Sequence, residues 1–438
     1  MRKQLLVLLL LAALTGSASG NYIVMQRVKL SGNNLCTWFF NTGIFNYYSS
    51  TSLSGLTYPC ESDDFFARGS GLSATCRING MPARFSCSYE GELTPGYVEN
   101  NTPFTGEDFK IYSVFKYDNE YSNPDYANWY KMIPFNAPYD DVNGNCIFDV
   151  GIDKPGIKDA NQTLFICMTD AFIQQRNDPF GGISYPLLFA EVRMTAWVYN
   201  STPVLEDVNF IKYEIINKGI RKWDSLAFSF FVNPVLGSGN TEFELTGCDT
   251  TSAIGYAYGN NGTKFKSYGA IILNGVQDKN TGKKSRLSSF TIDSPVTSCE
   301  SIFGFSNYYG LKSDGSPILD PTKNLGGNKY GSTKFLYYGI PGSNIGWAPE
   351  DGRIANCGGV DTGTVIPSYP ADRIIMMNTG GYDFSMAPAD TQTIVYCQTV
   401  NSNSTQGSAI SGLLSRLKSV EVIYNSDIKY IAENNCRN

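Results

Sequence analysis

Apolar and polar positions alternate along most of the chain with a period close to two. Between about residues 21 and 100, short aromatic and aliphatic runs are separated by Asn, Gly and Ser, which favour turns. The stretch SGLSATCRINGMPARFSCSYEGE predicts a β-hairpin that turns at Ile78-Asn79-Gly80. Residues 101–160 are rich in loops. From Thr163 onwards, longer strand-like runs follow at hairpin spacing: TLFICMTD, LLFAEVRMTAWVYN, VNFIKYEIINKG and SLAFSFFVNP.

The run VNFIKYEIIN carries apolar residues on both faces of the strand that it predicts. Val208 and Phe210 fall on one face, and Ile211 and Ile215 fall on the other. This pattern is typical of a strand that is covered on both sides. We therefore predict a mainly β fold. It should be a large antiparallel β-sandwich, jelly-roll or supersandwich-like, with long loops.

One segment near the C-terminus has a different period. Its apolar residues are spaced three and four apart, which marks one face of a helix: Ile410, Leu413, Leu414, Leu417 and Val420. We predict an amphipathic helix from about Ala409 to Ile423, with Ser408 as its N-cap. Packing against the β-sheet is the role expected for its apolar face.

The N-terminus, MRKQLLVLLLLAALTGSASG, has the features of a secretory signal peptide over residues 1–20. Its apolar core is shorter than the roughly 20 residues that span a bilayer, and no later segment is long and apolar enough. We expect no membrane span and a secreted protein, extracellular or on the outer cell surface, with the periplasm as an alternative. Residues 21–160 are predicted to form an N-terminal β-rich region and residues 161–438 a β-sandwich region ending in the helix. Alternatively, the two regions form one continuous domain.

The amino-acid composition and net charge limit the kinds of partner that the protein is expected to bind. Only 17% of residues are charged, whereas 13% are aromatic, and the chain holds 43 glycines and 28 tyrosines. The formal net charge is −6 and no basic cluster occurs, which argues against nucleic acid as a partner. Five N-x-S/T triplets are glycosylation acceptors in a host with that machinery: they begin at Asn100, Asn161, Asn200, Asn261 and Asn403.

The chain has eleven cysteines and no CxxC motif, which in an exported protein favours disulfides over metal ligation. We expect neighbouring cysteines to pair, although sequence alone cannot fix the connectivity. The expected pairs are Cys36–Cys60, Cys76–Cys87, Cys146–Cys167, Cys248–Cys299 and Cys357–Cys397. This would leave Cys436 as a free thiol or an intermolecular link.

The chain contains no histidine. This excludes Ser-His-Asp and Cys-His nucleophile systems and histidine-ligated zinc or copper sites. Glycoside hydrolysis needs only two carboxylates, so the lack of histidine does not exclude it. Its candidate acids are Asp63, Asp64, Glu90, Glu92, Asp140 and Asp141. No catalytic motif is recognisable, so we lean towards a protein that is not an enzyme.

The stretch DDVNGNCIFDVGID, residues 140–153, resembles a calcium loop. Calcium takes six to eight oxygen ligands, which alternate positions of a short loop can supply. The candidate ligands are Asp141, Asn143, Asn145, the backbone carbonyl of Ile147, Asp149 and Asp153. Cys146 stands where a turn glycine usually lies, and Pro134 and Pro138 argue against a preceding EF-hand helix. The alternative is a plain Asx-rich turn.

Several segments occur in an order that resembles a known family: TWFFNTGIFN, ELTPGYVEN, DVNGNCIFDVGIDKPGIKDANQTLFICMTD, LFAEVRMTAWVYN, FIKYEIINKG and GCDTTSAIGYAYGNN. The family comprises large exported β-rich proteins of Bacteroidota and Ignavibacteria type, often associated with type IX secretion. The resemblance covers about residues 36–430 and implies export and β-rich architecture, without an assigned activity. No sorting domain follows the helix before Asn438, so we expect another export route, a periplasmic location or a truncated chain.

Three functions fit these features. The first is a calcium-stabilised structural or adhesive protein that associates with copies of itself. The second is a glycan-binding module with aromatic stacking platforms, for which Trp129-Tyr130, Trp197 and Trp347 are candidates. The third is a carboxylate-dependent glycoside hydrolase. We favour the first, because of the missing histidine, the odd number of cysteines and the calcium-type loop.

Overall fold

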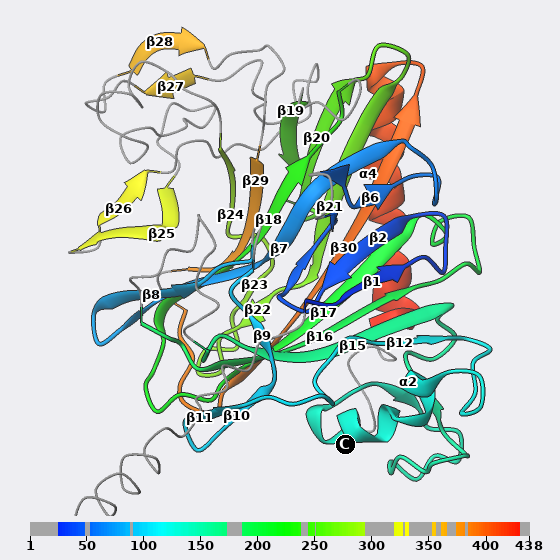
Figure 1. Ribbon diagram of the computed structural model, residues 1–438. Coiled ribbons are helices and arrows are strands. Elements are labelled where there is room, and N and C mark those ends of the chain that lie inside the picture. The colour runs from blue at the N-terminus through cyan, green and yellow to red at the C-terminus, as the bar shows by residue number, and fades with distance from the viewer. Residues whose placement is uncertain are drawn as a thin grey trace, which may run out of the picture.

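Figure 1 shows the computed structural model of the chain. The structure describes residues 25–48, 53–87, 91–172, 186–237, 244–249, 251–293, 319–326, 329–332, 353–355, 361–365, 374–381 and 384–429. The expected signal peptide, Glu90, Trp347, Cys299, Cys357 and Cys436 therefore lie outside the described residues.

Two large antiparallel sheets form the body of the protein, which confirms the predicted fold class. The first sheet contains β1 (Arg27–Leu30), β2 (Cys36–Phe40), β3 (Ile44–Phe45), β7 (Phe65–Ile78), β18 (Asp224–Pro234), β29 (Ile374–Gly380) and β24 (Ser289–Asp293), in that order, with β6 (Leu56–Thr57) and β8 (Met81–Phe85) attached. The second contains β12 (Tyr112–Phe115), β15 (Gln162–Thr169), β16 (Ala190–Val198), β17 (Val208–Asn217), β30 (Thr391–Asn403), β21 (Phe265–Asn274), β20 (Ile254–Asn260) and β19 (Glu244–Asp249), with β9 (Thr94–Pro95) attached to β15. The first sheet takes strands from both sides of residue 160.

Several two-stranded antiparallel ribbons accompany the two large sheets. They are the pairs β4 (Tyr47–Tyr48) with β5 (Leu53–Ser54), β10 (Tyr97–Glu99) with β11 (Thr102–Phe104), β13 (Tyr139–Asp140) with β14 (Lys154–Pro155), and β22 (Val276–Gln277) with β23 (Lys284–Ser285). Two further pairs are β25 (Leu319–Gly326) with β26 (Lys329–Ser332), and β27 (Arg353–Ala355) with β28 (Asp361–Val365).

The core lies between the two sheets. Phe230 of the first sheet stacks on Tyr396 of the second, with ring centroids 4.6 Å apart. The amide Nδ2–H of the buried Asn46 donates to Gln398 Oε1 at 2.8 Å, so this polar pair between the sheets is hydrogen-bonded. This arrangement explains why VNFIKYEIIN has apolar residues on both faces, because every residue of β17 is buried.

The other face of the second sheet is covered by helix α4 (Gln406–Ile423), which continues as the π-helical turn η4 (Tyr424–Ile428). Gly269 of β21 lets the helix approach closely, because a Cβ atom there would lie 2.8 Å from Leu413 Cδ2. The predicted apolar face is confirmed, but the helix begins at Gln406, earlier than predicted. Thr405 is its N-cap and accepts a hydrogen bond from the backbone N–H of Ser408, which we had expected to be the cap.

The predicted hairpin is confirmed, since β7 and β8 pair around Asn79-Gly80 and both residues have positive φ. The Cys36–Cys60 disulfide is also confirmed. The Cys76–Cys87 pair is wrong, because Cys76 lies opposite Ala83 in the hairpin and the thiol of Cys87 donates to the carbonyl of Thr42.

The Cys146–Cys167 pair is also wrong. Cys146 is an exposed thiol on the 140–153 loop, whereas Cys167 is buried within β15. The Cys357–Cys397 pair is wrong as well, because Cys397 is a buried free thiol. The Cys248–Cys299 pair includes Cys299, which lies outside the described residues.

Candidate functional site: an Asx-rich loop and its surroundings

The 140–153 loop is held at its base by a two-stranded ribbon. Tyr139 and Asp140 of β13 pair with Pro155 and Lys154 of β14. Lys158 Nζ lies 3.2 Å from Asp140 Oδ1, which adds a charge contact beside the ribbon. The ends of the loop are therefore fixed in register, and most residues of the loop itself are exposed.

Asp141 organises the first half of the loop. Its carboxylate accepts backbone N–H groups from Gly144 at 2.8 Å, Asn145 at 3.2 Å and Cys146 at 2.8 Å. Cys146 has φ +63°, the left-handed conformation that glycine usually adopts at this position of a calcium loop. Cys146 therefore has the backbone conformation of the turn position that it occupies in the comparison with a calcium loop.

The second half of the loop converges on Asp149 and Asp153. The side-chain amides of Asn143 and Asn145 both donate to Asp149 Oδ2, at 2.8 and 2.7 Å. Asp153 is buried and accepts the backbone N–H groups of Val142 at 2.8 Å and Asp149 at 2.7 Å. The five predicted side-chain ligands thus belong to one hydrogen-bond network.

The sixth predicted ligand is the backbone carbonyl of Ile147. The Ile147 side chain is 65% exposed, and its backbone N–H donates to Asn145 Oδ1 at 2.8 Å.

The positions of the carboxylate oxygens and the orientation of the amides show how the network relates to a metal site. The carboxylate oxygens of Asp141, Asp149 and Asp153 do not all lie within 4.8 Å of one another. The amide NH₂ groups of Asn143 and Asn145 point at Asp149 and satisfy it. A cation would replace these donors, and the two amides would have to turn their oxygens towards it. Among the described residues, the close ligand group is instead Cys36, Cys60 and Glu61, whose sulfurs already form the disulfide.

Apolar side chains point away from the network, which sequence reasoning did not anticipate. Their exposed fractions are 54% for Val142, 65% for Ile147, 66% for Val150 and 53% for Ile152. Cys146 is exposed among them. Clusters of exposed apolar side chains on soluble proteins commonly mark contact surfaces.

Two of the candidate stacking platforms, Trp129 and Trp197, do not reach the surface. Trp129 is fully buried and donates its Nε1–H to the carbonyl of Pro138 at 2.9 Å, and Trp197 is buried against Phe210. Tyr130 is half exposed. The most exposed tyrosines in the described part of the chain, Tyr117 at 86% and Tyr121 at 91%, were missed. Sequence offers only a weak signal for them, namely the surrounding run of turn residues.

The candidate hydrolase acids that the structure describes are Asp63, Asp64, Glu92, Asp140 and Asp141, and they lie in separate parts of the chain. Asp64, just before β7, pairs with Lys266 at 2.9 Å. Glu92 is buried and accepts the backbone N–H of Ser86 at 2.8 Å. Asp140 and Asp141 serve the ribbon and the loop described above, and Asp63 is exposed. No observation on these acids favours a catalytic pair.

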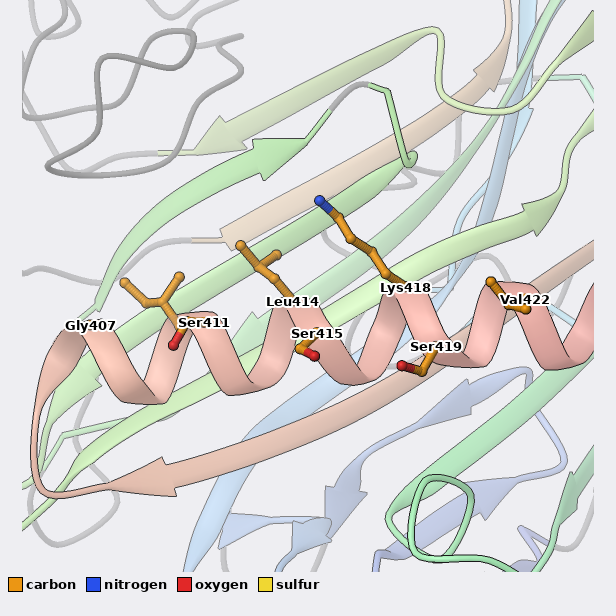
Figure 2. A pocket seen from close by; sticks show the side chains of 8 residues that line it. Gly407, Ser411, Leu414, Ser415, Lys418, Ser419 and Val422 are labelled. Atoms are coloured by element: carbon orange, nitrogen blue, oxygen red, sulfur yellow. The ribbon is translucent and has the colours of Figure 1, made fainter.

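A shallow groove of about 570 Å³ runs along the outer face of α4. Figure 2 shows Ser411, Ser415 and Ser419 on one side of the helix, with Leu414 and Lys418 pointing to the other. Lys418 Nζ lies 3.0 Å from Asp249 Oδ2, so its charge is paired. The lining residues offer methyl groups and hydroxyls without an aromatic ring or a carboxylate, which gives the groove no evident chemistry.

In the part of the chain that the structure describes, no helix has the length and hydropathy needed to cross a bilayer. Comparison with known proteins adds no relative, since no family model matches the chain and no curated protein is detectably similar.

Proposed function

We propose that this protein is an exported, non-catalytic structural or adhesive protein of the cell surface or extracellular space, whose 140–153 loop is stabilised by calcium. The resemblance to large exported β-rich proteins agrees with this proposal. The Cys36–Cys60 disulfide supports it as well, because disulfides persist chiefly in oxidising compartments.

One observation carries the proposal. In the 140–153 loop, five oxygen-bearing side chains turn inward while four aliphatic side chains turn outward. Phe148 is the apolar residue of the loop that packs inward, against Tyr139, so burial of apolar area stabilises only part of the loop. Carboxylate and carboxamide oxygens are ligands for a hard divalent cation, and the loop would offer them once the amides of Asn143 and Asn145 turn their oxygens towards the ion.

The outward set has a consequence for function. Leaving four aliphatic side chains in water forgoes the stabilisation of burying them, roughly 1.5–3 kcal/mol for each fully buried side chain. Contact with another surface recovers part of this free energy. The loop is therefore proposed to brace the protein through the cation and to contact a partner, such as a second copy, through Val142, Ile147, Val150 and Ile152.

Isothermal titration of calcium chloride into the mature, oxidised protein tests the proposal. We expect a saturable binding heat in wild type that is absent in the double variant Asp141→Ala, Asn145→Ala. The matched control is Asp278→Ala, since Asp278 caps an exposed Asx turn by accepting the backbone N–H groups of Asn280 and Thr281. This variant should bind calcium like wild type. Absence of heat in wild type, or equal heat in the double variant, would contradict the proposal.

A further inference from the structure

A pocket of about 330 Å³ adjoins the 140–153 loop. Its walls are the end of β12, the following turn, Tyr126 of helix α2 (Pro124–Ala127), and the segment from Lys154 to Ala160. Asp140, which begins the loop, is part of the same wall. We propose that this pocket binds a neutral glycan end of one or two sugar residues; the inference rests on the proposed adhesive role and names a ligand class for it.

The pocket is built from fixed backbone. The Lys116 backbone N–H donates to the carbonyl of Asn161 at 3.0 Å, and the Ile157 N–H donates to Thr163 Oγ1 at 3.0 Å. Gly156 has φ +97°, and a Cβ atom there would lie 3.0 Å from Thr163 Oγ1, so this wall is closely packed. The volume lies near the lower end of the range for ligand pockets, about 300–1,000 Å³. A small ligand would therefore meet a largely preformed site.

The turn after β12 is also held in place. Asp118 Oδ2 accepts the backbone N–H of Phe115 at 2.8 Å and the amide Nδ2–H of Asn123 at 2.6 Å. Asn123 in turn caps α2 by accepting the backbone N–H of Asp125. These bonds fix the position of the Tyr117 backbone between Phe115 and Asp118.

The charges of the pocket balance. Three lysines and three aspartates line it: Lys116, Lys154, Lys158, Asp118, Asp140 and Asp159. Lys116 Nζ lies 3.6 Å from Asp159 Oδ1, and Lys158 Nζ lies 3.2 Å from Asp140 Oδ1. With no net charge, the pocket gives neither anions nor cations an overall Coulombic advantage. Each ion pair still presents donors beside acceptors, which matches a hydroxyl group because a hydroxyl both donates and accepts.

Aromatic rings stand at the same pocket. Tyr117 is 86% exposed and Phe115 is 43% exposed, and both residues line the pocket. Tyr126 is half-buried on the adjoining wall. A sugar ring has an apolar C–H face and a hydroxyl edge, and the pocket supplies an aromatic surface for the first and paired charges for the second. A simple ion would leave the exposed rings unused.

Saturation-transfer difference NMR on the full mature protein tests the inference. The probes are maltotriose, cellotriose, mannotriose and triacetylchitotriose as neutral glycans, and a galacturonic acid trimer as the acidic comparison. We expect at least one neutral trisaccharide to bind, and Tyr117→Ala to weaken its affinity by about tenfold or more. The matched control is Tyr121→Ala, which removes an equally exposed ring that does not line the pocket and should leave the affinity unchanged.

The inference is overturned if none of the neutral trisaccharides binds, if only the acidic trimer binds, or if Tyr117→Ala leaves the affinity unchanged. Each titration is run in calcium and in EGTA. Tyr117-dependent binding in a protein that takes up no calcium would uphold the pocket and contradict the calcium loop. Calcium uptake without binding of any neutral trisaccharide would uphold the calcium loop and contradict the glycan pocket.

Discussion

Asp153 Oδ1 accepts the backbone N–H of Val142 at 2.8 Å and thereby closes the 140–153 loop on itself. Asp153 is only 2% exposed, and its other oxygen accepts the backbone N–H of Asp149. The two ends of an otherwise exposed loop are thus joined through one buried carboxylate. This contact links the proposed calcium loop to the β13–β14 ribbon, which also forms part of the proposed glycan pocket.

Replacing Asp153 by alanine should destabilise the protein. Two backbone N–H groups would lose their acceptor, and each such loss costs about 1–3 kcal/mol where the group stays shielded from water. Asp153→Asn keeps one carbonyl oxygen as an acceptor and should therefore lower the free energy of unfolding by less than Asp153→Ala. Urea unfolding of both variants measures the difference. Equal stability of Asp153→Ala and wild type would show that the closing contact is not needed.

The buried ion pair between Lys266 and Asp64 should lose more stability when the aspartate is removed than when the lysine is removed. Lys266 is 2% exposed, pairs with Asp64 at 2.9 Å, and burial lowers the pKa of its ammonium group. Asp64→Ala leaves this buried cation without its acid and should cost about 3–5 kcal/mol. Lys266→Met leaves Asp64, which is partly exposed to water, and should cost less. Chemical unfolding of the two single variants compares them, and the opposite ranking would contradict the burial argument.

Alkaline pH should destabilise the fold. Burial raises the pKa of the Cys76, Cys167 and Cys397 thiols above their ordinary value of 9.0, and raises the pKa of Tyr268 above 10.0. Below about pH 9 these groups are protonated in both states, so their stabilising effect is complete. Above it the unfolded chain releases protons that the folded chain keeps, and stability falls as pH rises.

Unfolding free energies measured between about pH 8 and pH 10.5 test this dependence. Cys397→Ala should give a shallower decline than wild type, because one buried thiol no longer contributes to the difference in bound protons. A decline of the same slope in both proteins would contradict the role of this thiol, whatever the variant's stability at neutral pH.

Thiol labelling should single out Cys146. Maleimide reacts with accessible thiolates, and Cys146 is exposed whereas Cys76, Cys167 and Cys397 are buried. Peptide mapping of the native protein should show rapid modification at Cys146 and slow modification at these three. Under non-reducing conditions the peptides of Cys36 and Cys60 should remain linked. Fast labelling of Cys167 in the folded protein would contradict its placement in β15.

Sequence patterns predicted the elements whose signals are local. The Asn79-Gly80 turn and the spacing of Leu413 and Leu417 depend on nearby residues, and both predictions are confirmed. The Cys76–Cys87 pairing failed because strand register, not sequence distance, decides which side chains meet. The start of α4 moved because Thr405 and Ser408 are both acceptable caps by residue type.

Exposure was the least predictable feature of the candidate site. Trp129 was a candidate for either a surface platform or a core residue, and the structure shows a core residue, since its ring is buried and its indole N–H donates to the carbonyl of Pro138. Tyr117 carries no distinguishing local pattern, and only the three-dimensional arrangement sets it beside Lys158 and Asp159. The candidate loop ligands form a pattern that is visible in the sequence because they alternate within one short segment, whereas a pocket collects residues from several segments.

Thermal unfolding of the mature, oxidised protein in excess calcium and in EGTA tests the central claim most directly. A ligand that binds only the folded state stabilises it by about 2.7 kcal/mol when its concentration is 100 times the Kd. We predict a clearly higher Tm in calcium for wild type, and no calcium-dependent difference for the double variant Asp141→Ala, Asn145→Ala. The same Tm for wild type in calcium and in EGTA would contradict the account and leave residues 140–153 as an Asx-rich turn.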